Sequence, residues 1–272
     1  MSDKSAATPA VAARTAIAFR GGGFVPGRSA WAAAAAFAAL LAAWHLASAT
    51  GVLPALFMPS PGAVGIALWR LAESGALAQH VAVSLQRIAL GWSLGVGAGL
   101  ACGIAMGLFT LARAAGLPVA MALFPIPKIA LLPLFILWLG IGEASKLATI
   151  GLGVFFPTVV GAMAAVDNVP RSLVRMGQSF GLPPWRIVFS IVLPGALPGI
   201  LAGFRISAAI ALILLVSAEM IGAQFGIGAF ILAAGNLMQT DQLLAGVALL
   251  SVLGLAIGAL LTALERTLLR WR

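Results

Sequence analysis

Long apolar runs constrain this chain more than any other feature. They cover residues 30–49, 81–109, 113–139, 146–166, 196–222 and 243–264. Each run can cross the hydrocarbon core of a bilayer, which requires about 20 apolar residues in a helix. Only 8% of the 272 residues are charged, whereas an ordinary soluble domain has about 25%. The sequence therefore predicts an all-α integral membrane protein with about six transmembrane helices.

The first apolar run could also belong to a secretory signal peptide. Ala47, Ser48 and Ala49 at its end resemble a small-residue cleavage site. However, a long polar leader, residues 1–29, precedes the run, and the run itself is long enough to span a membrane. We therefore interpret it as the first transmembrane helix.

The runs divide the chain into four predicted parts. These are a cytoplasmic N-terminal segment (1–29), a first transmembrane helix (30–50), a periplasmic segment with a short amphipathic helix (51–80) and a core domain (81–272). Lys and Arg residues accumulate on the cytoplasmic side of membrane proteins. Most of them fall on the side of the N-terminus, and Arg70, Arg87 and Lys146 fall on the other side. We therefore expect both termini to be cytoplasmic, in a bacterial inner membrane.

Several classes of protein do not fit this sequence. The single cysteine, Cys102, provides no disulfide framework, and His45 and His80 are too far apart in sequence to suggest a metal pair. An intramembrane enzyme would need a metal set, an Asp pair or an activated nucleophile, and the few acidic residues lie mostly at the ends of runs. The basic residues are scattered over short gaps, which disfavours a nucleic-acid partner. No Walker A sequence is present, so we expect no ATPase activity and no cofactor in this chain.

Glycines form a regular ladder along the second run. Gly91, Gly95, Gly99, Gly103 and Gly107 recur at every fourth position. Four residues advance about 400° around an α-helix, so these glycines form one slowly winding groove. Small residues allow helix backbones to approach closely in a membrane, where lipid provides no hydrophobic drive for helix association. Although the chain has 32 glycines, this strict register predicts a helix-packing groove.

The loop of residues 167–194, between the fourth and fifth runs, has the pattern of two short helices. The Asp167-Asn168 pair offers a cap for the first helix. Gly181 suits the end of that helix, and the prolines that follow prevent its continuation. The second helix, residues 185–192, is expected to stop at Leu193-Pro194.

The first of these two helices is predicted to be amphipathic. Val169, Leu173, Met176 and Phe180 follow helical spacing on one face, and the arginines lie elsewhere on the surface. An apolar stripe outside the bilayer needs a partner. Either the helix lies on lipid headgroups, which its arginines would favour, or it docks into a cytoplasmic protein.

The same loop carries a motif. Gly181 is followed, after nine residues, by Ile191-x-Leu193-Pro194. This pattern resembles the second half of the EAA motif of binding-protein-dependent ABC importer permeases, written EAA-x3-G-x9-I-x-L-P. By position, Arg175, Met176 and Gly177 occupy the EAA places. Because Arg replaces Glu at position 175, the ion pairs that such a loop makes with its partner stay open.

Further strings are similar to the nitrate, sulfonate and taurine branch of this family. They are MPSPGAV (58–64), HVAVSLQRIALGW (80–92), PLFILWLGIGEASK (133–146), FFP (155–157), VLPGALPGILAGFR (192–205), AEMIGA (218–223) and the terminal LERTLLRWR. Because the strings occur in order, the resemblance extends over residues 53–272.

The resemblance implies a type I ABC importer permease fold and a defined set of partners. These would be a second copy of this chain in a homodimer, two cytoplasmic ABC ATPase subunits, a periplasmic solute-binding protein and the lipid bilayer. The ATPases would bind ATP and Mg, and the loop would couple them to the membrane helices. The implied coupling residues are Asp167, Arg171, Leu173, Arg175, Met176, Gly177, Phe180, Gly181, Pro183, Trp185, Arg186, Ile191, Leu193 and Pro194. The solute would be a small anion such as an alkanesulfonate, taurine or nitrate, with a vitamin precursor as the alternative.

Polar residues in or beside the spans are candidates for the translocation pathway, because a charge at mid-bilayer is costly. Glu219 ends the fifth run, so it should lie near the outer boundary, face a wet cavity or pair with a cation. Lys128 follows a break made by two prolines, with Trp138 nearby in sequence. Asn236 lies in a polar, Gly-rich segment of residues 224–241.

Two charged residues lie at the outer start of the fourth run. Glu143 and Lys146 are three positions apart, which is the spacing of a local ion pair on a helix. We interpret them as such a pair, with contact to the binding protein as the alternative.

An ion-coupled secondary transporter is the competing class on physical grounds. Such transporters often contain inverted repeats and bind their ions at broken helices. The sequence has no convincing internal repeat, and a secondary transporter would leave the apolar stripe of the loop unexplained. The sequence therefore favours the importer permease.

Overall fold

The computed structural model describes residues 30–51, 54 and 56–271 of the chain, and every regular element in this part is a helix. The predicted N-terminal segment, residues 1–29, lies outside the described residues. The chain forms two compact units, residues 1–52 and 53–272. The first unit contributes α1 (Ala30–Ala49), an apolar helix of 20 residues.

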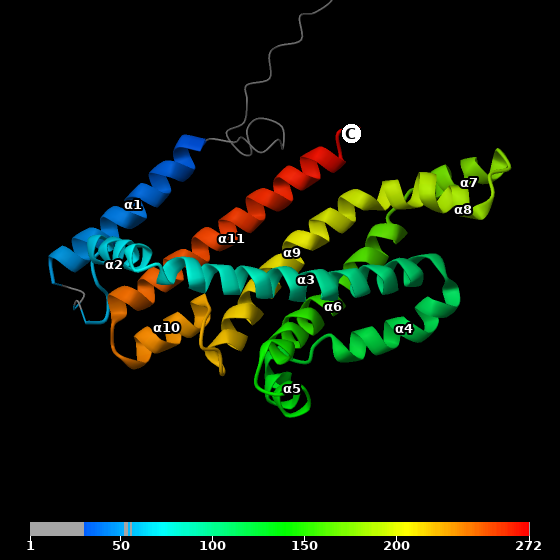
Figure 1. Cartoon of the computed structure of the whole chain (residues 1–272). Helices are drawn as coiled ribbons and strands as arrows, with labels where there is room; N and C mark the ends of the chain where they lie inside the picture. Colours follow the sequence, from blue (N-terminus) through cyan, green and yellow to red (C-terminus); the bar gives the residue numbers. More distant parts are fainter. Residues whose placement is uncertain (1–29, 52–53, 55, 272) are drawn as a thin grey trace, which may run out of the picture. The chain divides into compact units, whose positions relative to one another are not determined.

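The second unit contains the remaining helices (Figure 1). They are α2 (Pro61–Glu73), α3 (Ala76–Leu108), α4 (Thr110–Leu123), a 3₁₀ turn (Lys128–Leu131), α5 (Leu132–Leu139), α6 (Glu143–Asp167), α7 (Arg171–Ser179), α8 (Pro184–Ile187), a π-helical segment (Val188–Val192), α9 (Leu193–Met220), α10 (Ile227–Asn236) and α11 (Thr240–Leu268). Within the described residues, five helices are long and apolar enough to cross a membrane, or six if α4 and α5 form one bent span. The predicted all-α membrane fold is confirmed.

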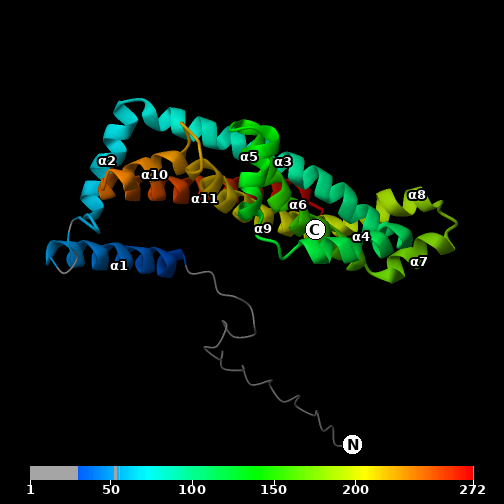
Figure 2. The ribbon, with the colours of Figure 1, turned by 90° about the horizontal axis from the view of Figure 1, so that it is seen from below.

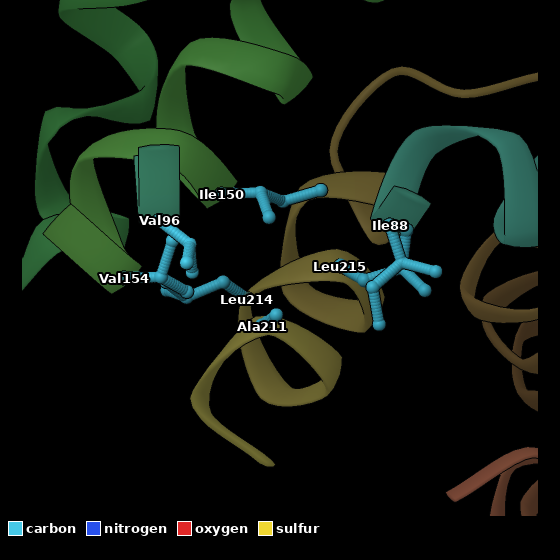
Figure 3. Packing of buried hydrophobic residues seen from close by; sticks show 7 residues of the cluster. All are labelled: Ile88, Val96, Ile150, Val154, Ala211, Leu214 and Leu215. Carbon is cyan, nitrogen blue, oxygen red and sulfur yellow. The ribbon is translucent and has the colours of Figure 1, made fainter. Parts of the chain in front are cut away.

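Helix α6 is the centre of the second unit, because it packs against both α3 and α9 (Figures 1 and 2). One cluster of buried side chains joins the three helices (Figure 3). Its members are Ile88 and Val96 from α3, Ile150 and Val154 from α6, and Ala211, Leu214 and Leu215 from α9. Helix α11 packs outside this core, against α9, α10 and α2.

The glycine ladder of α3 faces α6 along its whole length. A Cβ atom added at Gly103 would lie 2.5 Å from the Val159 carbonyl oxygen, and one at Gly95 would overlap the backbone of α6. The other ladder positions, Gly91, Gly99 and Gly107, would meet α6 atoms at 2.7–2.9 Å. By contrast, Gly97 lies off the ladder, and its added Cβ would meet nothing within 4 Å. The ladder therefore marks the line on which the two backbones approach most closely.

The third apolar run forms two helices rather than one. α4 ends at Leu123, and the next helical segment turns away by 86°. Lys128 follows the break, where its ammonium donates hydrogen bonds to the carbonyls of Leu123 (2.6 Å), Phe124 (3.2 Å) and Ile126 (2.7 Å). The same ammonium lies 4.9 Å from the ring centroid of Phe156. Lys128 therefore pairs the carbonyl groups that the broken helix leaves free.

The fifth span starts earlier than the sequence predicts. A stop at Leu193-Pro194 is wrong, because α8, the π-helical segment and α9 form one continuous apolar span from Pro184 to Met220. In the π-helical segment the amide of Leu193 donates to the carbonyl of Val188, five residues earlier. This wider turn accommodates Pro194, which has no amide proton and whose ring would clash with a carbonyl in a regular α-helix.

The predicted polar segment of residues 224–241 also differs. Most of it forms the helix α10, for which the sequence gives no prediction. The first residues of α10 are fixed by side chains from α3 and α9, as described below.

Candidate functional site

Helices α7 and α8 lie beside each other at one end of the second unit, where α6 ends and α9 begins (Figure 1). Gly177 is the buried contact of α7, and a Cβ at this position would lie 2.8 Å from the Cδ1 atom of Ile191. Gly181 ends the helix with φ +68°, a left-handed conformation that favours glycine. The amide of Leu182 then donates to the Gly177 carbonyl at 3.1 Å. This corner directs the chain into α8, which starts at Pro184.

The outer face of this corner is apolar. The exposed fractions are 41% for Leu173, 50% for Met176 and 78% for Phe180. We name these three residues the docking surface. Val169 does not belong to it, because only 6% of this residue is exposed and it packs in a buried cluster with Ile187 and other side chains. The predicted apolar stripe therefore splits into one core residue and three exposed residues.

Arginines lie on the same two short helices as the docking surface, Arg171 and Arg175 on α7 and Arg186 on α8. Arg171, Arg175 and Arg186 are exposed, and none of the ion pairs found among the described residues includes them. The guanidinium of Arg186 lies 5.3 Å from the ring centroid of Trp185, which is itself 60% exposed. The helices α7 and α8 thus present both an exposed apolar surface and positive charge.

Asp167 has a different role from the expected one. It is the last residue of α6, and α7 begins after Pro170 without a side-chain cap. The Asp167 carboxylate accepts two hydrogen bonds from Arg113 at the start of α4, at 2.8 and 2.6 Å. The prediction of a helix cap is wrong, because this longer-range ion pair occupies the carboxylate.

A second polar arrangement lies where the start of α6 and the end of α9 meet α3. Only 4% of Arg87, on α3, is exposed. Its Nε and one terminal nitrogen each donate to an oxygen of Glu143 at 2.6 Å. The other terminal nitrogen donates to Glu219 at 2.9 Å and to the carbonyl of Phe225 at 2.6 Å. We name Arg87, Glu143 and Glu219 the charge cluster.

Glu219 is completely buried, and its carboxylate is fully engaged. Besides Arg87, it accepts hydrogen bonds from the Ser84 hydroxyl at 2.7 Å and from the amide of Gly228 at 2.9 Å. The Ser84 hydroxyl oxygen accepts from the amide of Ile227 at 2.9 Å. Glu219 and Ser84 therefore satisfy the first amides of α10 and fix its start. Of the environments expected for Glu219, the structure has the ion pair with a cation.

The predicted local ion pair between Glu143 and Lys146 is wrong. Glu143 pairs with Arg87, which is 56 positions away in sequence. The Lys146 ammonium instead donates to the carbonyl of Gly142 at 2.9 Å. Bidentate geometry explains the preference, because a guanidinium matches both carboxylate oxygens and an ammonium does not.

The four pathway candidates do not share one environment. Glu219 lies in the charge cluster, and Lys128 donates to the carbonyl of Leu123 at the C-terminal end of α4. Trp138 on α5 is 66% exposed, with its ring 6.2 Å from that of Phe135. Asn236 is exposed at the end of α10. The pairing role of Arg87 was not predicted, although its position inside an apolar run was the available signal.

Comparison with known proteins defines the class. Residues 93–270 match the family described as binding-protein-dependent transport system inner membrane component. The chain belongs to this family of ABC transporter permeases.

Individual relatives cover most of the chain. The chain is 37% identical to the taurine transport system permease protein TauC of Escherichia coli K12, over 86% of this chain and 87% of TauC. It is 35% identical to the putative aliphatic sulfonates transport permease protein SsuC of Bacillus subtilis, over 86% and 85%. It is 32% identical to the riboflavin transport system permease protein RibX of Chloroflexus aurantiacus, over 85% and 87%.

Solved structures give the fold. An inward-facing structure of the MetNI methionine ABC transporter contains a chain that matches with a TM-score of 0.58 and 21% identity. The match covers 68% of this chain and 92% of that chain. The expected type I importer permease fold is therefore confirmed.

Proposed function

We propose that this chain is the membrane-spanning subunit of an ATP-driven importer, which carries a small sulfonate-type solute across the bacterial inner membrane. Two copies of the chain would form the passage, two cytoplasmic ATPase subunits would bind ATP and Mg, and a periplasmic binding protein would deliver the solute. Both termini would be cytoplasmic. The chain itself would perform no chemistry.

The docking surface is the observation that carries this proposal. Leu173, Met176 and Phe180 are exposed beyond the end of two long helices, and their apolar area is unfavourable in water. Because α7 is joined to α6 at one end and through α8 to α9 at the other, a partner that moved α7 would also move the central helices. Rigid-body transmission of this kind is a recognised route of conformational coupling.

Charge supports a protein partner with an acidic rim. Arg171, Arg175 and Arg186 are exposed on the two short helices that carry the docking surface, and complementary charge would orient the partner during association. The substitution Arg175→Glu should therefore weaken docking and lower the coupling of ATP hydrolysis to uptake. Unchanged coupling would contradict the acidic rim without affecting the docking surface itself.

The solute class comes from the relatives. A taurine permease and an aliphatic sulfonate permease are similarly close to this chain, and both solutes carry a sulfonate group. A vitamin-type solute has weaker support, from the more distant RibX. Calorimetry on the solute-binding protein that co-purifies with this chain, with taurine, ethanesulfonate and riboflavin, would decide among them.

Triple substitution of Leu173, Met176 and Phe180 by Ala tests the proposal. Uptake of the solute should fall by more than about tenfold, because removing about 1.4 kcal/mol of docking free energy already weakens binding tenfold. The substitution Phe57→Ala is the matched control, since Phe57 is 75% exposed but lies on the segment before α2. Both variants should remain monodisperse in detergent. Retained uptake in the triple variant would refute the proposal.

Crosslinking separates the two possible partners of α7. With Cys102 replaced by Ala, a cysteine at position 175 should be captured by the ATPase subunit in native membranes. If position 175 is instead protected only by lipid headgroups, α7 lies on the membrane surface and the importer proposal fails.

A further inference from the structure

An ion pair joins the start of α4 to the end of α6, next to the segment that carries the docking surface. The guanidinium of Arg113 donates to both oxygens of the Asp167 carboxylate, at 2.8 and 2.6 Å. Asp167 is the last residue of α6, and three residues, 168–170, separate it from α7. We name this contact the α4–α6 ion pair. It holds α4 at the point where the chain leaves α6 for α7.

Neither charge suits the helix end on which it lies. Arg113 is in the first turn of α4, where the helix dipole disfavours a cation, and Asp167 is at the end of α6, where the dipole disfavours an anion. The side chains of Arg113 and Asp167 are 41% and 38% exposed, and ion pairs this exposed contribute little to stability. Helix stability therefore does not account for the pair.

Packing around the pair is incomplete. Arg113 and Asp167 line an open pocket of about 390 Å³, together with Gly107 near the end of α3 and Val174 on α7. The pocket lies between the α3–α4 connection and the α6–α7 connection, so side chains do not fill the space between them. The α4–α6 ion pair spans this opening. It therefore links the two connections at a place where close packing does not.

The order of the helices leaves α4 without a direct connection to α7. α7 is joined along the chain to α6 and, through α8, to α9, whereas α4 follows α3 and leads to α5. α7 packs mainly against α8 and the π-helical segment, and α4 packs mainly against α3. The α4–α6 ion pair is therefore the most direct link from the start of α7 to α4.

We propose that the α4–α6 ion pair makes α4 move together with α7 when the ATPase subunits move α7. The inference rests on the proposed function, because it requires an ATPase at the docking surface. Arg113 and Asp167 are positioning residues, which act by holding α4 rather than by contacting solute or nucleotide. Through α4 the movement would reach the break after Leu123, where the chain turns by 86°. α4 would thus be a third helix that responds to the ATPase, besides α6 and α9.

The distance between α4 and α7 tests this inference without knowledge of the solute. Spin labels are attached to Ala115→Cys and Gln178→Cys, two exposed positions, in a Cys102→Ala background. The importer complex is purified in nanodiscs through a tagged copy of this chain, with labelled copies diluted in unlabelled ones so that distances within one chain are recorded. Pulsed electron paramagnetic resonance then gives the distance without nucleotide and with the ATP analogue AMP-PNP and Mg. The distance should be the same in both states, and in Asp167→Asn it should shift when AMP-PNP binds.

Charge reversal separates pairing from other effects of substitution. Arg113→Asp combined with Asp167→Arg places an anion at the start of α4 and a cation at the end of α6, the arrangement that the helix dipoles favour. This double variant should restore the constant distance, and its thermal midpoint should not fall below that of the protein with the original pair. Asp167→Asn should change the midpoint by no more than about 4 °C, because an exposed ion pair contributes little.

A second exposed ion pair provides the matched control. Arg205 on α9 pairs with Glu265 on α11, with similarly exposed side chains. Glu265→Gln breaks this pair and should leave the α4–α7 distance independent of AMP-PNP. A shift as large as that of Asp167→Asn would mean that loss of any surface ion pair loosens the fold, and it would overturn the inference.

Three further results would overturn it. They are a distance that changes with AMP-PNP although the pair is intact, a distance that stays constant in Asp167→Asn, and a charge-reversed pair that behaves like the single variant. Capture of the ATPase by a cysteine at position 175 involves neither Arg113 nor Asp167. Failure of this inference and failure of the proposed function are therefore separately visible.

Discussion

The contact between α3 and α6 makes a sharp prediction for Gly103. A Cβ at this position would lie 2.5 Å from the Val159 carbonyl oxygen and 2.8 Å from the Cβ of Ala162. Ordinary van der Waals contacts begin about 1 Å further out, and close-packed interiors have little free space for adjustment. The obstacle at Val159 is backbone, which cannot rotate away. Gly103→Ala therefore forces the two helices apart.

The expected cost follows from overpacking. Extra methyl groups in a well-packed core typically cost about 1–3 kcal/mol. In a chain of this size each kcal/mol shifts the thermal midpoint by about 2–4 °C. Alanine gains about 1 kcal/mol of helix propensity over glycine, so the net cost is about 0–2 kcal/mol and Gly103→Ala should lower the midpoint by up to about 8 °C.

Two other glycines provide graded controls. Gly97 lies on the same helix with no atom within 4 Å of its added Cβ, so Gly97→Ala should raise the midpoint slightly. At Gly116 the nearest atom is the sulfur of Met106 at 2.9 Å, a flexible side chain that can move, so Gly116→Ala should fall between them. Size-exclusion chromatography after heating in detergent measures all three midpoints. If Gly103→Ala and Gly97→Ala had equal midpoints, the close backbone approach would be refuted.

Two further substitutions test the buried polar groups by the same heating assay. Glu219→Ala should destabilise the protein by about 3 kcal/mol, the lower end for breaking a buried pair, because Glu143 still holds Arg87. The exposed Glu73→Ala is its control and should leave the midpoint unchanged; equal midpoints would mean that the ion pair is dispensable. Lys128→Met should cost about 1–3 kcal/mol, because the carbonyls at the end of α4 lose their donor. Lys128→Arg should restore part of this loss, and no loss at all in Lys128→Met would contradict the capping role.

The membrane spans could be predicted from the sequence because they depend mainly on local composition. Helix-length apolar runs have few alternatives in a bilayer. The glycine ladder was also readable, since register along one helix fixes which residues share a face. The sequence did not predict that α6 packs against this face, because the spacing of the glycines does not indicate which helix approaches them.

Predictions from local sequence were wrong where the backbone adapts or where side chains from another helix decide the structure. Pro194 predicts a helix stop, but the π-helical turn of Val188–Val192 removes the clash and lets the span continue. No helix is predicted in the polar, Gly-rich segment of residues 224–241, but α10 forms there, and Ser84 and Glu219 satisfy its first amides. In the first case the backbone itself adapts within the predicted helix, and in the second case the decisive side chains lie on other helices.

The charge cluster shows the same effect for an ion pair. Spacing along the helix pairs Glu143 with Lys146, whereas in the fold Glu143 binds Arg87, which in turn binds Glu219, 132 positions away. Glu143 binds the guanidinium of Arg87 rather than the ammonium of Lys146, because the guanidinium offers two parallel donors to one carboxylate and further donors to the next. Lys146 is buried beside this cluster, where its charge balances the two carboxylates and the one guanidinium, and its ammonium donates to the carbonyl of Gly142. Spacing along one helix therefore fails to predict the ion pair because the better-matched donor comes from another helix.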